Sequence, residues 1–443
     1  MMRFRRWFAA TAVLALAAGA CATDATEEDV PAAEAEAPAE EVDGEEVAGD
    51  EVAGDEVPDN PSEGVPPGEV VLGWMGDLTG PTASQTAQLL RGTEAYFAMV
   101  NDEGGVLGRE VRIVSRDDEY AAEQGVTNYR ALVGDEQVLG LINIAGSHIS
   151  TALIPDIEND QIAVIGPSQT IDDQLDSPYM FHTLAHYADM ADVALARLAE
   201  KIEGEASDLV VVAVNLEVPS GAEWAEFIGE KVEALGGRYL GSISLAPDQT
   251  DFVSPITQVQ QLADDEGVNA VAFHGSPATA LGIATAMDDL GLRLPVGGIQ
   301  TLANRSVYQE GPSDMLDLLE GTHSFVPCTV STPGTDRMNA FLEGTEWEGE
   351  CGSISWIHGW VNAMVAHQAI ERAAEEYGEL NRETFFQALQ GTYDTEGLSC
   401  DYDWTDANYS PCAAPFTWDG TSLVPAAPFD DWLDVMMATG AGN

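Results

Sequence analysis

A regular alternation of two hydrophobic patterns between residues 70 and 300 constrains the fold more than any other feature of this chain. Short apolar runs, typical of buried strands, alternate with longer amphipathic segments, typical of helices. We expect strands at 70–75, 110–115, 138–144, 163–165, 209–215, 241–245, 270–273 and 295–297, and helices at 87–101, 121–134, 150–159, 187–202, 222–235, 253–265 and 278–290. Strand, helix and strand in repetition, joined by short turns, predict an α/β fold in which helices flank parallel sheets.

The chain beyond residue 300 adds a long expected helix at 356–377 and a strand at 416–418 that runs into an Asp419-Gly420 turn. The folded body, from about residue 69 onward, is long enough for a sizeable core. By the usual domain sizes it makes two domains or one large one.

The first residues have the layout of a cleaved export signal. Arg3, Arg5 and Arg6 precede an apolar stretch at 7–17 that is too short to span a bilayer, and small residues lead to Cys21. The pattern resembles a bacterial lipobox, with Ala18 where leucine is usual. We therefore expect 1–21 to be a lipoprotein signal peptide and Cys21 to carry the acyl chains that anchor the mature protein. Ordinary secretion, with Cys21 incidental, is the alternative.

Residues 22–68 contain no lysine, arginine or aromatic residue and carry the near repeats Glu-Glu-Val-Ala-Gly-Asp and Asp-Glu-Val-Ala-Gly-Asp. Such a segment cannot bury enough apolar area to offset the entropy lost on ordering. Its like charges repel one another. We expect an acidic disordered stalk that holds the body away from the membrane.

The charge balance narrows the range of partners. The chain has a formal net charge of −59, and only two of its 17 basic residues, Lys201 and Lys231, are lysines. Nucleic acid needs a basic patch, so we expect no nucleic-acid partner. A lysine-poor acidic surface favours adaptation to salty surroundings, where ions screen its self-repulsion. A metal store is the alternative, but no Asp-x-Asp-x-Asp-Gly loop is present, and we expect no metal.

Five cysteines leave four once Cys21 is lipidated, and four thiols in an oxidising compartment predict two disulfides. Three pairings are possible. Cys400 and Cys412 flank a short segment that a bridge could close, and Cys328 with Cys351 would then form the second pair. The close Cys or His spacing of a zinc site is missing.

Sequence motifs of common enzymes are absent. The chain has no Gly-x-Ser-x-Gly, no His-Glu-x-x-His, no Gly-x-x-x-x-Gly-Lys-(Ser/Thr) and no Gly-x-Gly-x-x-Gly after the first strand. We therefore expect no catalytic residue and no cofactor. An acid and base pair of carboxylates cannot be argued from so acidic a composition.

Several motifs at strand ends carry a family resemblance. The segments are Leu78-Thr79-Gly80-Pro81, the run 101–108 ending in Gly-Gly-Val-Leu-Gly, Asp117-Asp118, Gly146-Ser147, 167–170, Asp251-Phe252 and Gly291-Leu292. In order and spacing, from about residue 70 to 430, they resemble the type I periplasmic binding proteins, in particular the branched-chain amino acid (Leu/Ile/Val) group of ABC importers.

That resemblance implies two Rossmann-like lobes with parallel sheets, joined by three chain crossings near His186, near His323 and after Thr395. The implied N-terminal lobe is 69–186 with 324–395, and the implied C-terminal lobe is 187–323 with 396–430. Residues 431–443 form a tail.

The same resemblance implies the ligand-binding residues. Ser147 matches a serine that holds the ligand's carboxylate or amide end, and Ser168 and Thr170 match the pair that meets its polar head. The remaining positions lie in the first loop and the second lobe, and they are Gln85, Ser220, Ser276 and Gln300. Independently, small and polar clusters just after strands are typical of binding clefts in open parallel sheets, although each cluster alone could be only a turn or a helix cap.

Departures from the family pattern bear on the ligand. Gln300 stands where amino acid binders keep an acidic residue for the ammonium group, and a buried ammonium needs a carboxylate. Glutamine suits an amide, a hydroxylated solute or a carboxylate. Asp172 and Asp173 are possible substitutes, but an exposed helix start is the alternative for both. His148 and His274 are candidate donors to an anion.

The resemblance implies a monomeric, extracytoplasmic, lipid-anchored substrate-binding protein that captures a small polar solute in the cleft between its lobes and delivers it to ABC permease subunits. It would lie on the outer face of the cell membrane or in a periplasm. The alternative is a stand-alone sensory receptor of the same fold that acts on a signalling partner.

Overall fold

The computed structural model describes residues 68–351 and 353–426. The predicted signal peptide with Cys21, nearly all of the predicted stalk, and the tail lie outside the described residues. Among the helices of the described part, none is long and apolar enough to cross a membrane.

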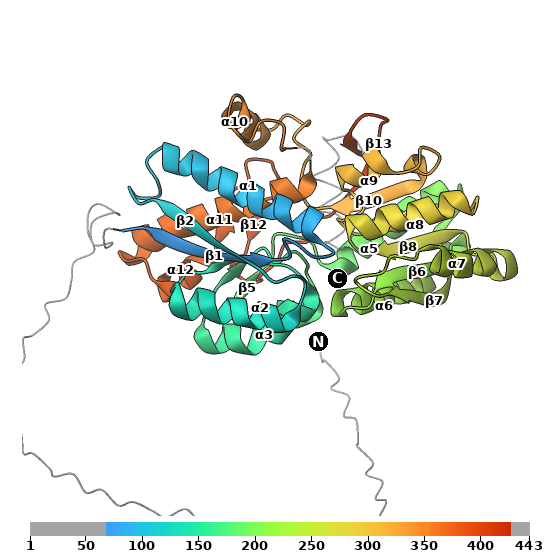
Figure 1. The fold of residues 1–443 in the computed structure, drawn as a ribbon, viewed down its shortest axis with the longest axis horizontal. Coiled ribbons are helices and arrows are strands. Elements are labelled where there is room, and N and C mark those ends of the chain that lie inside the picture. Colours follow the sequence, from blue (N-terminus) through green and yellow to red (C-terminus); the bar gives the residue numbers. More distant parts are fainter. Residues whose placement is uncertain (1–67, 352, 427–443) are drawn as a thin grey trace, which may run out of the picture. The chain divides into compact units, whose positions relative to one another are not determined.

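The first of two main sheets has five parallel strands in the order β2-β1-β3-β4-β5. The strands are β1 Val70–Gly76, β2 Val111–Asp117, β3 Leu141–Ile144, β4 Val164–Ile165 and β5 Met180–Phe181. Its helices are α1 Ala83–Asp102, α2 Ala122–Arg130, α3 Ser147–Asp160, α4 Asp172–Leu175, α11 Ile354–Tyr377 and α12 Arg382–Leu389, with a π-helical turn at Ala131–Asp135 after α2. Helices α1 and α11 lie on one face of the sheet, and α2 and α3 on the other (Figure 1).

Helices α1 and α11 approach each other unusually closely, and glycine makes this possible. A Cβ atom on Gly92 would collide with the backbone oxygen of Trp356, and a Cβ on Gly359 would collide with that of Leu89. The contact is therefore reciprocal, with one glycine on each helix. It ties a segment from late in the sequence to the first helix of the same lobe.

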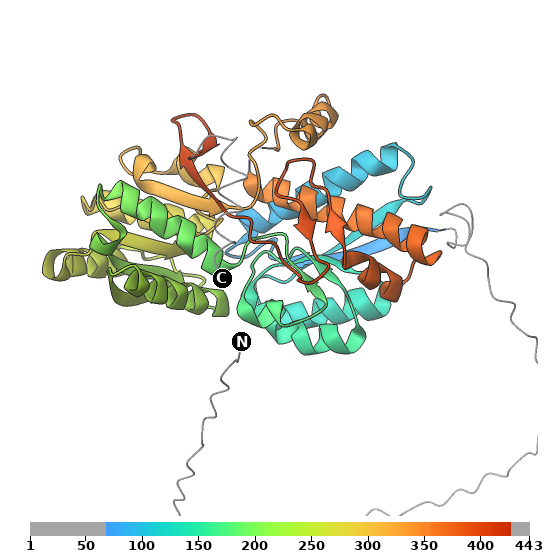
Figure 2. The same cartoon turned by 180° about the vertical axis from the view of Figure 1, so that it is seen from behind.

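The second main sheet has seven strands in the order β14-β13-β10-β9-β8-β6-β7. The parallel strands are β6 Val210–Leu216, β7 Arg238–Leu245, β8 Ala270–His274, β9 Val296–Gly298 and β10 Leu319–His323. Strand β13 Ala414–Trp418 pairs antiparallel with β10, and β14 Leu423–Pro425 pairs antiparallel with β13. Its helices are α5 Tyr187–Lys201, α6 Pro219–Ala234, α7 Val253–Glu266, α8 Pro277–Asp289 and α9 Arg305–Glu310, with 3-10 turns at Ala206–Asp208 and Leu316–Leu318. Helices α5 and α6 cover the face seen in Figure 2, and α8 covers the other (Figure 1).

The chain passes between the two lobes three times, after β5, after β10 and before β13. The three crossings are hydrogen-bonded to one another. The backbone N–H of Ala185 donates to Ser324 Oγ at 2.9 Å, Ser399 Oγ donates to the Ser324 carbonyl at 2.6 Å, and Tyr402 OH donates to the Thr183 carbonyl at 3.1 Å. We call Thr183, Ser324, Ser399 and Tyr402 the crossing cluster. The α/β class and the two-lobed architecture with three crossings are as predicted.

The lobe boundaries at 186/187, 323/324 and 395/396 stay predictions. The short sheet of β11 Thr392–Tyr393 and β12 Tyr402–Asp403 pairs residues from the two sides of the last boundary. Trp404, just after β12, also packs on Phe181 of β5 with ring centroids 5.3 Å apart.

Most expected elements are present with shifted ends, and some elements were not predicted. Helix α3 begins at Ser147, not at 150, and β3 begins at Leu141, not at 138. Strand β10, the helices α9, α12 and α10 (Pro333–Leu342), and the short strands β5, β11, β12 and β14 were missed, whereas α4 starts at Asp172, as the alternative for Asp172 and Asp173 had it. Both expected disulfides are present, since Cys328 is bonded to Cys351 and Cys400 to Cys412.

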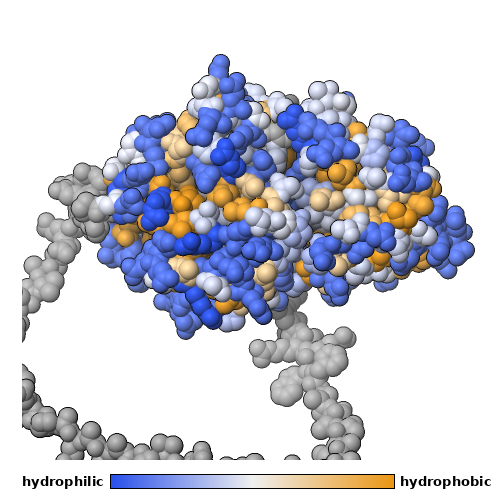
Figure 3. Space-filling model, in the orientation of Figure 1, coloured by the Kyte–Doolittle hydropathy of each residue, from blue (hydrophilic) through white to orange (hydrophobic). Residues whose placement is uncertain are grey.

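The face of the molecule in Figure 3 is largely hydrophilic, with smaller hydrophobic areas on both lobes. The apolar side chains gather inside, where one large buried cluster spans both sheets and a second fills the space between the first sheet and the helices α2 and α3. The core thus fixes the strand ends of both lobes in place, and those ends carry the candidate site.

Candidate functional site

A polar cavity lies between the carboxyl ends of strands from both main sheets. Its volume is about 50 Å³, which is the space of a few water molecules. Six of the seven residues that the family resemblance implied for ligand binding line it: Gln85, Ser147, Ser168, Ser220, Ser276 and Gln300. The structure therefore brings together residues from five separate strand ends and from the start of α1.

Four helices begin at this cavity. Helix α1 follows Thr82, α3 begins at Ser147, Ser220 is the second residue of α6, and α8 follows Ser276. Gly146, which precedes α3, has φ +90°, a conformation that glycine adopts without strain. Because the N-terminal turns of helices carry free N–H groups and a partial positive charge, the cavity favours an oxygen-rich or anionic group.

Hydrogen bonds cross the cavity from one lobe to the other. Ser147 Oγ donates to Ser220 Oγ at 2.9 Å, and the backbone N–H of Ser220 donates to Ser147 Oγ at 3.1 Å. Gln300 Nε2 donates to the Ser168 carbonyl at 3.1 Å. These bonds hold the lobes together through the same groups that were predicted to meet a ligand.

His274 extends this network. Its Nε2 lies 3.0 Å from Ser220 Oγ, and burial lowers the pKa of His274 to about 4. The imidazole is therefore neutral at pH 7. Its Nδ1, together with Gln300 Oε1 and Thr301 Oγ1, is buried and has no hydrogen-bond partner in the protein. Buried polar atoms are normally paired, so these three atoms are free to form hydrogen bonds with a group bound in the cavity.

Two predicted residues lie off the cavity wall. Thr170 is fully buried, and its hydroxyl donates to the Leu184 carbonyl at 3.0 Å and lies 3.2 Å from His182 Nδ1. His148 Nε2 lies 3.0 Å from the Tyr120 carbonyl, and burial lowers its pKa. Thr170 thus supports the loop after β4, and His148 supports the loop that carries Tyr120.

Several lining residues were missed by the sequence reasoning. Tyr120, Tyr187, Thr301 and Gln169 line the cavity, as does His274, which had been only a candidate. Tyr120 follows the Asp117-Asp118 pair at the end of β2, so its position just after a strand could have identified it as a lining residue. Tyr187 follows the first crossing and comes near the cavity only because the lobes meet there.

Ionised side chains are missing from the lining of this cavity within the described chain. Asp172 and Asp173 do begin a short helix, as the alternative reading held, and both are exposed. Neither contributes to the cavity wall.

Two buried acidic residues instead hold the loops that follow β1 and β2. Asp77 accepts hydrogen bonds from the backbone and hydroxyl of Thr82 at 2.6 and 2.8 Å. Burial raises the pKa of Asp118 to about 7, and its Oδ1 accepts from the Tyr120 N–H at 3.0 Å. Each acidic side chain therefore shapes its own loop, and neither lines the cavity.

Comparison with known proteins gives a consistent picture. A family model described as "Periplasmic binding protein" matches residues 69–421. The chain is similar to the Leu/Ile/Val-binding protein homolog 1 of Brucella melitensis, with 24% identity over 359 residues that cover 79% of this chain and 91% of the relative.

Two further similarities concern signalling and fold. The chemotactic signal transduction system substrate-binding protein BasB of Halobacterium salinarum is 25% identical over 284 residues, 62% of this chain and 64% of that protein. The crystal structure of a branched chain amino acid ABC transporter protein from Thermus thermophilus with bound valine superposes with a TM-score of 0.72 at 19% identity, covering 84% of this chain and 99% of that one.

Proposed function

The chain belongs to the periplasmic binding protein family, a family of extracytoplasmic solute-binding proteins rather than enzymes, and we propose that it captures a small polar solute in the cavity between its lobes for delivery to an ABC permease. The observation that carries this proposal is the bridge Ser147–Ser220–His274 together with the bond from Gln300 to the Ser168 carbonyl. The Ser147–Ser220 and Gln300–Ser168 bonds join cavity-lining residues of the two lobes, and the Ser220–His274 contact extends the first of them within the second lobe.

Closure provides the means of delivery. A solute that replaces or extends these bridging bonds interacts with both lobes only when they are together, so it stabilises the closed form over an open one. A permease that recognises the closed form then receives loaded protein selectively. The cavity and its unpaired atoms Gln300 Oε1, Thr301 Oγ1 and His274 Nδ1 support this role.

The chemistry of the wall favours a solute that carries a carboxylate or amide and no free ammonium. Four helix N-termini and the hydroxyls of Ser147, Ser220 and Ser276 suit an oxygen-rich group. An ammonium would find no carboxylate among the residues that line the cavity in the described chain, and a buried unpaired charge costs several kcal/mol. The volume of about 50 Å³ favours a small solute.

A thermal-shift screen in high salt tests this assignment. Purified full-length protein is titrated with leucine, isoleucine and valine, and in parallel with short carboxylates, simple amides, urea and polyols. We expect a short carboxylate or amide to raise the unfolding midpoint by a few degrees in a concentration-dependent way. A rise with the branched-chain amino acids alone would overturn the solute class, and no rise with any of these solutes would count against the small-polar-solute proposal.

The variant Gln300→Glu sharpens the screen, because it restores the acidic residue of the amino acid binders. We expect it to weaken binding of a carboxylate by roughly tenfold or more, since a buried negative charge would face the anion. Gln261→Glu, an exposed position on α7, is the matched control and should bind as the parent does. Equal affinity in all three proteins would place the solute away from Gln300.

The proposal includes a lipid anchor at Cys21 and an acidic stalk at 22–68. Both rest on the sequence and lie outside the described residues. Metabolic labelling with a radioactive fatty acid, compared between the parent and Cys21→Ser, tests the anchor. Label in the parent and none in the variant is expected, and equal labelling would remove the assignment.

A sensory role is the second candidate, and the similarity to the chemotaxis protein of Halobacterium salinarum favours it. The two roles differ in the partner of the closed form. Deletion of the gene should abolish uptake of the identified solute if the protein serves a permease. Intact uptake with a lost tactic response would favour the sensory role.

A further inference from the structure

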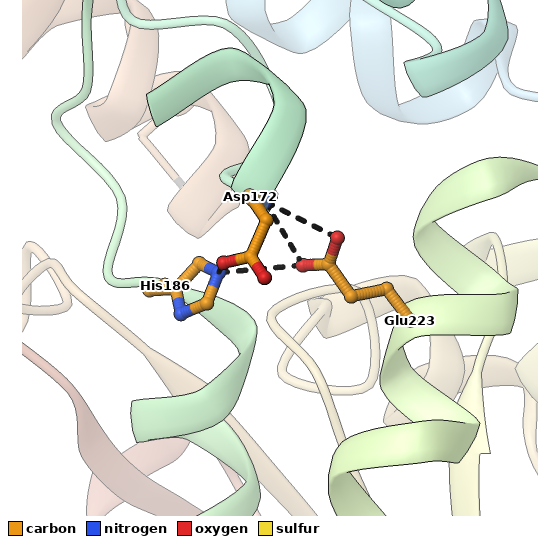
Figure 4. Close-up of side chains that lie close together, drawn as sticks. All are labelled: Asp172, His186 and Glu223. Carbon is orange, nitrogen blue, oxygen red and sulfur yellow. Dashed lines mark hydrogen bonds and ion pairs between the residues drawn. The ribbon is translucent and has the colours of Figure 1, made fainter. Parts of the chain in front are cut away.

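Three potential metal ligands meet outside the cavity, where the two lobes adjoin. Asp172 is the first residue of α4 in the first lobe, His186 precedes α5 at the first crossing, and Glu223 lies on α6 in the second lobe (Figure 4). Their candidate ligand atoms all lie within 4.8 Å of one another. Asp172 and His186 both belong to the first lobe, and Glu223 comes from the second, so the meeting of the lobes completes the group.

The two distances from His186 Nε2 match the ligand separation at a tetrahedral metal. His186 Nε2 lies 3.2 Å from Asp172 Oδ1 and 3.3 Å from Glu223 Oε1. Metal–ligand bonds of about 2.0–2.1 Å at tetrahedral angles place neighbouring ligand atoms about 3.3 Å apart. The observed separations therefore leave a place for an ion between the imidazole and the two carboxylates.

The state of His186 is the second and independent observation. Its side chain is buried, with 7% of the residue exposed, yet Nε2 has no hydrogen-bond partner in the protein although two carboxylate oxygens lie close to it. Phe227 packs against the ring at a centroid distance of 5.1 Å, which helps to fix its direction. A buried nitrogen that makes no hydrogen bond but lies 3.2 and 3.3 Å from two carboxylate oxygens is an arrangement that a metal ion would satisfy.

We propose that Asp172, His186 and Glu223 form a divalent-cation site of the zinc type that joins the two lobes. One imidazole and two carboxylates are ligands for zinc and its neighbours among the transition metals, whereas magnesium and calcium take oxygen ligands alone. Asp172 has a side chain that is 73% exposed, so solvent reaches the site and a water molecule completes the fourth position. Because the ligands come from both lobes, the bound ion favours their closed arrangement.

The surroundings of the site also carry charge. Burial raises the pKa of Asp189, in the first turn of α5, to about 6, and the nearby His186 opposes this shift. Lys231 and Asp192 are the other charged neighbours of Asp189. The backbone N–H of Asp172 donates to both oxygens of Glu223 at 3.2 Å, which orients that carboxylate. The Glu223 carboxylate is thus held beside the imidazole before an ion binds.

Zinc and cobalt binding to the full-length protein test the site. The protein is first stripped with a chelator, and titrations are run in high potassium chloride with millimolar magnesium, which occupies the general acidic surface. We expect one tight site per chain for Zn²⁺ by isothermal titration calorimetry, and with Co²⁺ an intense visible absorption of four-coordinate geometry. Only weak binding of many ions, or a six-coordinate cobalt spectrum, would overturn the proposal.

Matched variants separate the site from the acidic background. Asp172→Asn and Glu223→Gln keep shape and fold, and each should weaken Zn²⁺ binding by roughly tenfold or more. Asp173→Asn and Glu226→Gln remove a neighbouring exposed carboxylate from the same helices and should leave affinity unchanged. His186→Gln removes the nitrogen ligand and should abolish the cobalt spectrum. Equal Zn²⁺ affinity in the site variants and the controls would show that these residues are not ligands. The solute screen does not depend on this result, so the two proposals fail separately.

Discussion

The seam between the lobes has two regions that differ in how fully their polar groups are paired. In the crossing cluster, Thr183, Ser324 and Ser399 are buried and hydrogen-bonded across chain segments. At the cavity, Gln300, Thr301 and His274 each keep a buried polar atom without a partner in the protein. The four side chains of the crossing cluster have partners without a ligand, although His182 and His186 beside them each keep a buried Nε2 without a hydrogen bond. The unpaired atoms at the cavity remain open to a solute. The difference marks which end of the seam serves folding and which serves binding.

Histidines reinforce the contrast at the crossings. Burial lowers the pKa of His182 and His358 to about 3 and that of His323 well below its usual value. His358 Nε2 lies 3.1 Å from Thr183 Oγ1, and His323 Nδ1 accepts from the Ser324 N–H at 2.9 Å. The crossings are therefore held by neutral imidazoles that must stay uncharged in the folded state.

Removal of the disulfide beside the crossings should have the largest effect on stability. The segment between Cys400 and Cys412 includes Asn408, whose carbonyl accepts from the His182 N–H at 2.7 Å. We expect the double variant Cys400→Ala/Cys412→Ala to lose about 3 kcal/mol of unfolding free energy, as measured by urea unfolding without reductant.

The second disulfide provides the comparison. Cys328 and Cys351 are 23 residues apart and Cys400 and Cys412 are 12 apart, so loop entropy alone predicts a slightly larger loss for the Cys328→Ala/Cys351→Ala protein. We expect the reverse order, because the Cys400–Cys412 loop also supports a crossing. A larger loss on removing Cys328–Cys351 would contradict the importance given to the crossings.

Much of the fold could be predicted because residues 70–300 pack locally and keep their periodicity. Strand β10 was missed because Glu320 interrupts its apolar pattern. That carboxylate is 1% exposed and is paired with Arg197 at 3.0 Å and Lys201 at 2.8 Å, both from α5. A buried charge with partners supplied by a distant helix leaves no sign in a local sequence window.

The candidate site also contains some residues that could be predicted from the sequence and others that could not. Ser147, Ser168 and Ser276 could be placed because each follows a strand, and parallel strands bring such positions to one edge. His148 and His274 could not be distinguished from the sequence, since one turns to a backbone carbonyl and the other to Ser220 across the seam. Contacts that arise only when two lobes meet are set by tertiary geometry.

The pH dependence of stability should report the crossing histidines. Because the pKa of His358 is lower in the folded state than in the unfolded chain, the unfolded state binds the extra proton as the pH falls below about 6.5, and stability is lost. One such histidine contributes a loss of about 2 kcal/mol between pH 7 and pH 5. Asp118 and Asp189 act in the opposite direction, because burial raises their pKa values to about 7 and about 6.

The variant His358→Gln isolates one crossing histidine from these opposing groups. Glutamine keeps an N–H for Thr183 and does not titrate. The change in unfolding free energy from pH 7 to pH 5 should therefore lack the loss of about 2 kcal/mol that His358 causes in the parent. Urea unfolding at both pH values gives this difference. An identical pH profile for the two proteins would mean that His358 is not held neutral in the folded state.

The most direct comparison of the two regions comes from one serine in each, and the serine at the cavity should give the smallest effect. Ser399→Ala removes the donor to the Ser324 carbonyl in a buried setting, and should cost about 1–3 kcal/mol of unfolding free energy. Ser220→Ala should cost about 1 kcal/mol or less, because the backbone N–H of residue 220 still donates to Ser147 Oγ and water in the cavity can meet His274. Urea unfolding of the ligand-free proteins measures both losses, and solute titration should show weakened binding for Ser220→Ala alone. If Ser220→Ala lost as much stability as Ser399→Ala, the cavity would be part of the folding framework, and its unpaired atoms would no longer argue for a ligand.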